Sequence, residues 1–469
     1  MESLNAVRRA IISISFVFFA ATAFAQPPVA HQQLAREIYK ELIEINTTAS
    51  SGSTTVAAEA MLKRLREAGF TAADVQLLGP DPRKGNLVAR LQGTDARRPM
   101  LLLAHLDVVE VRREEWSVDP FKLTEKDGYF YARGSSDDKA MAAIFVANLI
   151  RYKQEKLVPD RDVILALTAD EEIENSPTNG IDWLLKNHRQ LLDAEFALNE
   201  GGGVTLKNGK AIANRLQASE KISVTYRLEA KYPGGHSAVP GRETSIYLLA
   251  DALTRISKNA FPVKLTQATR GYFEKMAALE SGQDAEDMRA IARDPMDTSA
   301  ASRLSTRPSY NAQLRTTCVA TRLEAGQALN AVPQTAHAIV NCRVLPGESV
   351  AEVQQRLAEI IGNDKVSVTP IGPPTLSPPS PLRPDLVRAI ERLTAEFWPG
   401  AAIVPSMSAG MTDSRFLRSA GIPAYGHSGL AGEPNENRAH GIDERLSVKS
   451  FYDGLEYLYR LVKTLAAGE

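Results

Sequence analysis

The sequence predicts an α/β protein in which a mostly parallel sheet, with helices on both faces, is interrupted by an inserted ferredoxin-like α+β domain. Two observations support this fold class. From residue 34 to 217, and again beyond 384, helical apolar spacing alternates with short, continuously apolar segments, which is typical of a parallel sheet covered on both faces. Between these stretches, residues 219–370 follow the order strand, helix, strand, strand, helix, strand, which is the ferredoxin-like pattern.

The elements of the first stretch are predicted by the spacing of their apolar residues. In chain order we expect helices at 35–45 and 54–70, strands at 86–93 and 99–109, a helix at 137–156, a strand at 161–172, a helix at 179–192 and a strand at 195–203. The strands are apolar at almost every position, so both faces of the sheet should be buried.

The pattern of predicted elements changes at about residue 219. A strand at 221–230 and a break at 232–241 precede a helix at 244–257, then two strands on either side of Asn330 and a helix at 350–361. Residues from about 265 to 312 exceed what the ferredoxin-like pattern needs, and we expect them to form an additional helical cap.

A proline-rich segment at 370–384 should be a stiff linker back to the main sheet, which helices and strands from 386 to 466 complete. We therefore expect one domain from residues 26–218 and 371–469 and a second, inserted domain from residues 219–370.

The first 25 residues predict a secretory signal peptide. Arg8 and Arg9 precede an apolar run that closes on Ala23-Phe24-Ala25, a small-x-small pattern typical of cleavage before Gln26. The alternative is an uncleaved membrane anchor, although the run is short for a span of about 20 residues. We expect a secreted or periplasmic protein that has no membrane association after cleavage.

The net charge indicates which class of partner to expect, and the cysteines indicate whether a disulfide can form. The formal net charge is −1, so no basic field favours nucleic acid and the partners should be small molecules. Secretion permits disulfides, and Cys318 and Cys342 lie at about mirror-image positions of a predicted hairpin. A bridge between them and two buried free thiols are both open alternatives.

Acidic and histidine side chains recur at the ends of the predicted strands. His105 and Asp107 end one strand, Asp170, Glu171 and Glu172 end another, Glu200 ends a third, and Asp137 and Asp138 open a helix. Ligands bind outside the carboxyl ends of strands in open parallel sheets, so these groups should converge. Each motif alone has an ordinary structural explanation, but carboxylates mixed with imidazoles in one place suit zinc or a similar divalent ion.

These residues carry a family resemblance. The motifs HLDVV, RGSSDDK, ADEE, NEGG, YPGGHSAVP, ALNAVP with NCRVLPG, and AHGIDER stand in the order seen in di-zinc metallopeptidases that include aminoacylase, carnosinase, glutamate carboxypeptidase, carboxypeptidase S and succinyl-diaminopimelate desuccinylase. The resemblance spans residues 34–465. It implies a catalytic di-metal domain, an inserted lid or dimerisation domain, and two zinc ions per chain, or another divalent cation such as cobalt or manganese.

The resemblance also implies a role for each residue of the cluster. Asp137 resembles the ligand that bridges the two metals, with His105 and Glu200 completing one metal shell and Glu172 and His440 the other. The resemblance favours His440 over the second candidate, His427, because the family's ligand lies a few residues before an acidic residue that opens the last helix, here Asp443 or Glu444.

Two further roles follow from the same resemblance. Glu171 resembles the general base. Asp107 is expected to accept the second N–H of the His105 imidazole and so fix its tautomer. A cis peptide between Asp137 and Asp138 is also implied.

The resemblance assigns substrate binding to His236, Asn330, Arg343, Gly410 and Thr412. His236, after Gly234 and Gly235, resembles the histidine that reaches the scissile carbonyl oxygen, either from a partner subunit in a homodimer formed through the lid or after domain closure. Arg343 resembles the residue that binds a substrate carboxylate through a bidentate fork.

The function that follows is a secreted zinc-dependent hydrolase that cleaves an amide bond next to a residue with a free carboxylate. Its substrate would be a small peptide, for a carboxypeptidase or dipeptidase, or an N-acyl amino acid, for a deacylase. The alternative is a catalytically dead secreted binding protein with the same fold. Such a protein should have lost a ligand or the base, whereas every expected residue is present in this sequence.

Overall fold

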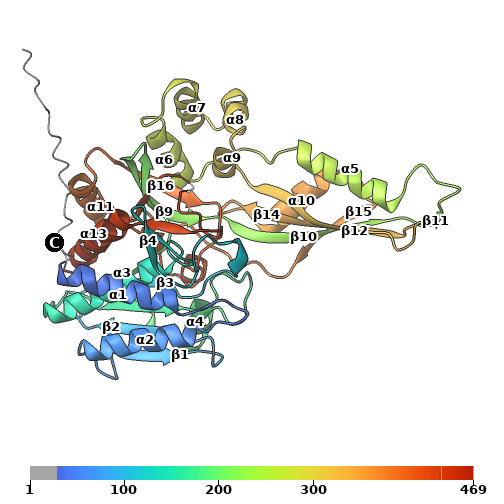
Figure 1. Ribbon diagram of the computed structural model, residues 1–469. Helices are drawn as coiled ribbons and strands as arrows, with labels where there is room; N and C mark the ends of the chain where they lie inside the picture. Colours follow the sequence, from blue (N-terminus) through green and yellow to red (C-terminus); the bar gives the residue numbers. More distant parts are fainter. Residues whose placement is uncertain (1–28, 435, 468–469) are drawn as a thin grey trace, which may run out of the picture.

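A large mixed sheet and a separate antiparallel sheet lie at opposite ends of an elongated molecule (Figure 1). The computed structural model describes residues 29–434 and 436–467. The predicted fold class is confirmed: a mostly parallel α/β sheet carries helices, and a four-stranded antiparallel sheet extends from it. The predicted signal peptide, residues 1–25, lies outside the described residues. Within the described ranges, no helix has both the length and the hydrophobicity that crossing a membrane requires.

The larger sheet has the strand order β1-β2-β6-β3-β7-β17-β9-β8-β18, with β16 beside β9. Its strands are Val75–Leu78 (β1), Asn86–Leu91 (β2), Met100–His105 (β3), Val163–Thr168 (β6), Phe196–Asn199 (β7), Gly203–Lys207 (β8), Lys210–Glu220 (β9), Ala402–Ser408 (β16), Ala424–Gly426 (β17) and Ala431–Gly432 (β18). The central strands β6, β3, β7 and β17 run parallel, so their carboxyl ends meet at one edge of the sheet.

Helices cover both faces of this sheet. They are Ala30–Glu44 (α1), Thr54–Glu67 (α2), Lys139–Gln154 (α3), Gly180–Asn187 (α4), Pro384–Phe397 (α11), Ser414–Ser419 (α12) and Val448–Ala467 (α13). Alternate residues of β3 enter different cores: Leu102 packs in the core with α1, α3 and α13, whereas Leu101 and Leu103 pack with α4 and α12. This explains why β3 is apolar at every position.

Short elements complete this part of the chain. Three small strands, Thr124–Lys126 (β4), Tyr129–Tyr131 (β5) and Arg445–Ser447 (β19), form a separate sheet in the order β19-β5-β4, and single 3₁₀ turns occur at Arg113–Glu115 (η1) and Arg189–Leu191 (η2). Strand β19 brings the segment before α13 against the segment before α3, which matters for the site described below.

The antiparallel sheet, which we call the lid, has the order β12-β14-β10-β15. It consists of Ile222–Lys231 (β10), Ser245–Lys258 (α5), Thr317–Ala325 (β12), Thr335–Val344 (β14), Val350–Ile361 (α10) and Val366–Ile371 (β15). Both helices pack on one face, where Tyr226 and Val340 of the sheet meet Leu249 and Leu357. At the far tip, Gly235–His236 (β11) pairs with Ala331–Val332 (β13), and Figure 1 shows this pair at the end away from the larger sheet.

A disulfide joins two strands of the lid. Cys318 of β12 lies directly opposite Cys342 of β14, with 4.0 Å between their Cα atoms, and the two sulfurs are bonded. Of the two alternatives that the sequence left open, the structure therefore contains the bridge.

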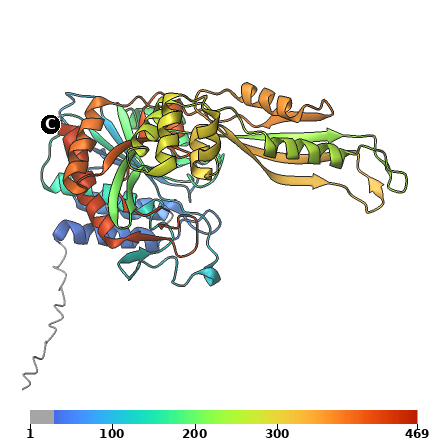
Figure 2. The same ribbon diagram turned by 90° about the horizontal axis from the view of Figure 1, so that it is seen from above.

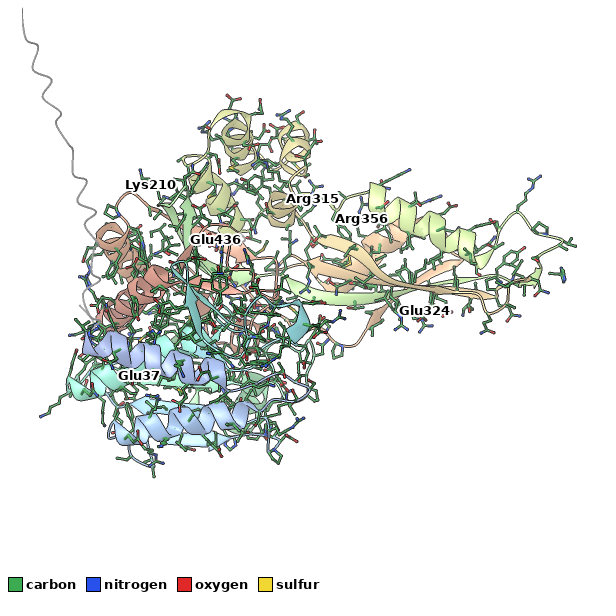
Figure 3. All side chains as sticks on the ribbon, viewed as in Figure 1. Glu37, Lys210, Arg315, Glu324, Arg356 and Glu436 are labelled. Carbon is green, nitrogen blue, oxygen red and sulfur yellow. A yellow bond between two sulfur atoms is a disulfide. The ribbon has the colours of Figure 1, made fainter. Side chains whose placement is uncertain are left out.

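Residues 265–312 form four helices, which we call the helical cap: Gln267–Met276 (α6), Gly282–Arg293 (α7), Thr298–Leu304 (α8) and Pro308–Leu314 (α9). The cap has its own small core around Phe273 and Met288. It lies beside the larger sheet, where α6 contacts β16, and next to the root of the lid (Figures 1 and 2). Arg315, just after α9, marks the junction of cap and lid in Figure 3.

Candidate metal centre

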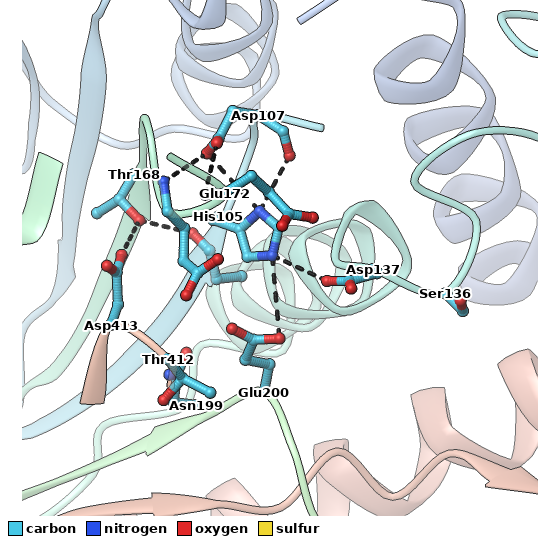
Figure 4. Close-up of polar contacts among 12 residues, drawn as sticks. His105, Asp107, Ser136, Asp137, Thr168, Glu172, Asn199, Glu200, Thr412 and Asp413 are labelled. Carbon is cyan, nitrogen blue, oxygen red and sulfur yellow. Dashed lines mark hydrogen bonds and ion pairs between the residues drawn. The ribbon is translucent and has the colours of Figure 1, made fainter. Parts of the chain in front are cut away.

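The carboxyl ends of three parallel strands bring the predicted ligands together. His105 is the last residue of β3, Glu171 and Glu172 follow β6, and Glu200 follows β7. Asp137 comes from the segment that opens α3, and Figure 4 shows it beside the His105 ring, with Glu200 below.

Asp137 lies between two histidines. Its Oδ1 is 3.0 Å from Nε2 of His105, and its Oδ2 is 3.2 Å from Nε2 of His440. The other expected neighbours are close as well: His440 Nε2 is 3.0 Å from Glu172 Oε2, and His105 Nε2 is 3.9 Å from Glu200 Oε2. One carboxylate thus offers one oxygen to each of two adjacent groups of ligands.

The donor atoms form two overlapping sets that could each hold a cation. Atoms of His105, Glu171 and Glu200 lie within 4.8 Å of one another, and so do atoms of His105, Asp137 and Glu172. Imidazole nitrogens and carboxylate oxygens in closed groups of this size are zinc-type ligands. Both sets include His105, and the first also includes Glu171, the predicted general base. The donor set therefore suits divalent cations of the zinc type.

The charges of the cluster favour cations as well. Burial, reinforced by the charge of Glu171, raises the pKa of Glu200 well above its ordinary value. Hydrogen bonds from His440 to Asp137 and Glu172 raise the pKa of the histidine to about 10. Each proton on an imidazole offsets a buried carboxylate, and a divalent cation in the same place would do so more fully.

Glu444 holds the segment that presents Asp137. Its buried carboxylate accepts hydrogen bonds from the backbone N–H groups of Gly134 (3.0 Å), Ser136 (2.7 Å) and Asp137 (3.2 Å), and from the Arg133 guanidinium (2.7 Å). Arg133 also donates to the backbone carbonyl oxygens of His440 and Gly441. Glu444 and Arg133 therefore fasten the Asp137 segment to the His440 segment.

The peptide between Asp137 and Asp138 is cis, as the resemblance implied. Asp138 is buried, and within the described part of the chain its Oδ2 has no hydrogen-bond partner. A cation near this oxygen would satisfy it.

Asp107 contributes differently from what the resemblance implied. The backbone carbonyl of Asp107 lies 3.0 Å from Nδ1 of His105, whereas its carboxylate is 3.7 Å away. The carboxylate instead accepts the backbone N–H groups of Glu171 (3.1 Å) and Glu172 (3.0 Å). Asp107 therefore orients a histidine with its main chain and two glutamates with its side chain.

Glu171, the predicted general base, is largely buried. Burial raises the pKa of Glu171 well above its ordinary value, and the charge of Arg415, whose Nη1 lies 3.7 Å from Oε1, opposes this shift. Sequence reasoning missed Arg415, although the GMTDSRF motif contains it. It also missed the roles of Arg133 and Glu444, which belong to the RGSSDDK and AHGIDER motifs.

His427, the second candidate ligand, is placed elsewhere. Its Nδ1 lies 3.0 Å from the backbone carbonyl of Arg215, and its Nε2 lies 2.7 Å from the Tyr457 hydroxyl. Both ring nitrogens are therefore engaged in the core, and burial lowers the pKa of this histidine to about 4.

The predicted substrate-binding residues are dispersed. His236 and Asn330 lie together at the tip of the lid, where the backbone N–H of Ser237 donates to the Asn330 carbonyl, far from the metal cluster in Figure 1. Arg343 is on β14 at the root of the lid, opposite Ser223. These assignments stay predictions, because closure or a second copy would be needed to bring the tip to the cluster.

Two predicted pocket residues lie in the loop after β16. Gly410 is exposed, whereas Thr412 is buried and donates both its N–H and its hydroxyl to Glu220. Its backbone carbonyl accepts from Arg415. Thr412 therefore holds the loop to the end of β9, and its polar groups are all engaged within the protein.

Comparisons with known proteins identify a family of metallopeptidases and related hydrolases. Residues 101–464 match the family model described as peptidase family M20/M25/M40. The human N-fatty-acyl-amino acid synthase/hydrolase PM20D1 is 30% identical over 386 residues, which cover 80% of this chain and 75% of that protein. The probable carboxypeptidase S-like 2 of Dictyostelium discoideum is 27% identical and covers 81% and 74%.

Solved structures share the fold. An M20 family metallo-carboxypeptidase from Sulfolobus solfataricus superposes with a TM-score of 0.66 at 18% identity, covering 92% of this chain and 98% of that one. Human carnosine dipeptidase 1 gives a TM-score of 0.62 at 13% identity, covering 93% and 97%.

Proposed function

This chain belongs to peptidase family M20/M25/M40, and from that membership we propose that it is a secreted two-zinc hydrolase of amide bonds next to a residue with a free carboxylate. It is a metallopeptidase or amidohydrolase of that family, with a plausible metal site of His, Asp and Glu residues. The observation that carries the proposal is Asp137, which lies within hydrogen-bonding distance of both His105 and His440.

The candidate ligands and the base come together in one cluster, which favours an enzyme over an inactive binding protein. Bound cations would supply Lewis acidity that activates water and the amide carbonyl. Asp137 would bridge them, with His105 and Glu200 on one side and Glu172 and His440 on the other. Zinc is the proposed metal because histidine and carboxylate together are its usual ligands.

Glu171 would move the proton. Its carboxylate accepts a proton from the attacking water as the water oxygen bonds to the carbonyl carbon. The same carboxyl group then donates this proton to the nitrogen of the leaving amino acid, and the C–N bond breaks. The Asp107 carboxylate keeps Glu171 in place by accepting the backbone N–H of Glu171. His236 would donate to the carbonyl oxygen after it reaches the site.

We also propose that the protein is secreted, and the disulfide supports this independently of the signal-peptide pattern. Residues 1–25 have the pattern of a signal peptide, and the Cys318–Cys342 bridge is of a kind that persists mainly outside the cytosol.

The substrate is proposed to be an N-acyl amino acid or a small peptide, in line with the named activities of the relatives. Arg343 would bind the carboxylate of the residue that cleavage releases. A panel of N-acyl amino acids and dipeptides tests this, each as a free acid and as the matching amide, with a chelator control. We expect the acids to be hydrolysed and the amides to lose at least about tenfold in kcat/KM, because a charge-assisted pair contributes about 1.5 to 3 kcal/mol.

Arg343→Ala should lose the same factor on the acid and little more on the amide, since the two partners act as a unit. Arg227→Ala is the matched control, because Arg227 lies farther along β10, on the same sheet. Equal hydrolysis of acid and amide by the wild type would contradict carboxylate anchoring and indicate an aminopeptidase-like specificity.

A further inference from the structure

A cavity of about 810 Å³ connects the metal cluster to the helical cap. Asp137 and Glu200 line one end of it, and Tyr272, Met276 and Tyr310 of the cap line another part. The volume lies in the range of roughly 300 to 1,000 Å³ that is typical of small-molecule sites. Because the proposed ligands line this cavity, a group attached to the scissile carbonyl can extend into it.

Helix α6 lies between the cap core and the cavity, and Tyr272 and Met276 border both. Phe273 and Ala277 are buried in the core of the cap. Tyr272 and Met276, four residues apart and thus on one side of the helix, line the cavity. The Tyr272 ring lies against Phe273, with 5.3 Å between ring centroids, and this contact fixes the wall.

Apolar side chains also line the facing wall. It is formed by the β8–β9 hairpin and the loop before β18, which supply Val204, Leu206, Ile212 and Leu430. The charged residues Lys207 and Glu280, which also line the cavity, pair with each other at 3.3 Å. Their charges are therefore partly satisfied, and the space between α6 and the hairpin favours an apolar group.

The cavity lining also includes the polar or charged residues Thr205, Glu433, Asn437 and Arg215, and Arg215 bears most directly on the acyl group. Its guanidinium donates at 3.2 Å to the carbonyl of Gly202, two residues after Glu200, and none of the ion pairs found among the described residues includes Arg215. It lies near the proposed ligand Glu200, so a carboxylate on the acyl group is the competing possibility that an experiment must separate.

We propose that the helical cap forms the outer wall of an acyl subsite, and that Tyr272 and Met276 set the size of the apolar acyl group that the enzyme accepts. This inference rests on the proposed amide hydrolysis and specifies the acyl half of the substrate as large and apolar. It also gives a function to residues 265–312, which the ferredoxin-like pattern of the lid does not require.

The test measures kcat/KM for acetyl, hexanoyl and decanoyl derivatives of one amino acid. We expect the wild type to favour decanoyl over acetyl by at least about tenfold, because each buried methylene adds to binding. Met276→Trp should lower the decanoyl-to-acetyl ratio about tenfold by filling the cavity. Ile212→Trp, on the facing hairpin, should do the same and covers the case in which the first variant fails to fold.

Glu274→Trp is the matched control, because Glu274 is exposed on α6 and does not line the cavity; it should keep the wild-type ratio. An unchanged ratio in both cavity variants would overturn the inference and leave amide hydrolysis standing. A wild-type preference for acyl groups that end in a carboxylate, lost in Arg215→Ala, would also overturn it.

A second readout does not depend on turnover. Metal-free protein should bind 11-(dansylamino)undecanoic acid with increased fluorescence, and Met276→Trp should weaken this binding, whereas Glu274→Trp should not. If the wild type hydrolysed neither acyl amino acids nor dipeptides, the proposed function would fail, and this titration would still decide whether the cavity takes an apolar chain. Equal binding by all three proteins would refute the subsite.

Discussion

At the scale of single residues, two neighbouring glutamates have different surroundings. Glu172 Oε2 lies 3.0 Å from His440 Nε2, whereas Glu171 Oε1 lies 3.7 Å from Arg415 Nη1. The backbone N–H groups of both donate to Asp107. Asp107 thus holds the main chain at the point where the proposed base, Glu171, and the proposed ligand, Glu172, follow each other.

Substitution of each glutamate separates these roles. Glu171→Gln should keep two metals per chain and lose several orders of magnitude in turnover, since it removes the proton carrier and no proposed ligand. Glu172→Gln should lose metal. Metal analysis together with kcat measurements checks both predictions. The reverse pattern would show that Glu172 is the base and Glu171 the ligand.

His427 predicts an acid-sensitive contribution to stability. Burial lowers the pKa of His427 to about 4, below the value of about 6.5 in an unfolded chain. Its stabilising contribution is therefore full above pH 6.5 and decreases as the pH falls toward 4, and about 2 kcal/mol should be lost between pH 8 and pH 5. Urea unfolding measures the free energy of unfolding of the wild type and of His427→Gln at pH 8 and at pH 5. The wild type should lose about 2 kcal/mol more than the variant between these two pH values. Parallel pH dependences in the two proteins would rule it out.

At the scale of elements, the site depends on two segments that are distant in sequence. The Arg133–Glu444 pair joins residues 311 positions apart, next to the pairing of β19 with β5. One segment ends in the proposed bridging ligand Asp137 and the other contains His440. The small sheet and the Arg133–Glu444 pair therefore hold together the two segments that carry the candidate ligands Asp137 and His440.

Glu444→Gln should weaken metal binding although Glu444 is not a proposed ligand. The amide cannot accept all the N–H groups that the carboxylate accepts, and Arg133 is left buried without its ion pair, which typically costs 3 to 5 kcal/mol. We expect fewer metal ions per chain after dialysis and a turnover that added zinc partly restores. Asp443→Asn is the control, because its carboxylate accepts only the exposed Ser117 N–H among the described contacts. A Glu444→Gln protein with wild-type metal content would show that the pair has no role in the site.

At the scale of the whole molecule, the lid extends away from the larger sheet and takes His236 and Asn330 with it (Figures 1 and 2). Arg343 stays near the root, because β14 runs from the tip region back to the junction. Of the predicted substrate-binding residues of the lid, Arg343 therefore lies at the root, whereas His236 and Asn330 lie at the tip.

A mixing experiment distinguishes closure from exchange between copies. We expect His236→Ala and Glu171→Gln to be inactive alone, and a mixture of the two to recover about a quarter of the wild-type activity if a C2 dimer shares lid tips. Size-exclusion chromatography of the mixture checks the dimer. No recovery from an equilibrated mixed dimer would assign His236 to its own chain.

Local patterns were sufficient to predict much of this protein. The apolar strands and amphipathic helices, the order of the lid elements, and the placement of acidic residues and His105 at strand ends all depend on neighbours within a few residues. A parallel sheet then brings strand ends to one edge wherever such strands form. The group of candidate ligands therefore followed from periodicity, motif order and resemblance.

Other features depend on residues far apart in sequence, and only the tertiary structure decides them. Glu444 reaches Asp137 across more than 300 residues, the side chain of Asp107 turns to Glu171 and Glu172, and the helical cap lies beside the larger sheet at the cavity. Hydrogen bonds and packing of this kind have no period in the sequence. These contacts depend on how complete helices and strands pack against one another, because buried donors, acceptors and apolar faces meet their partners only in the packed structure.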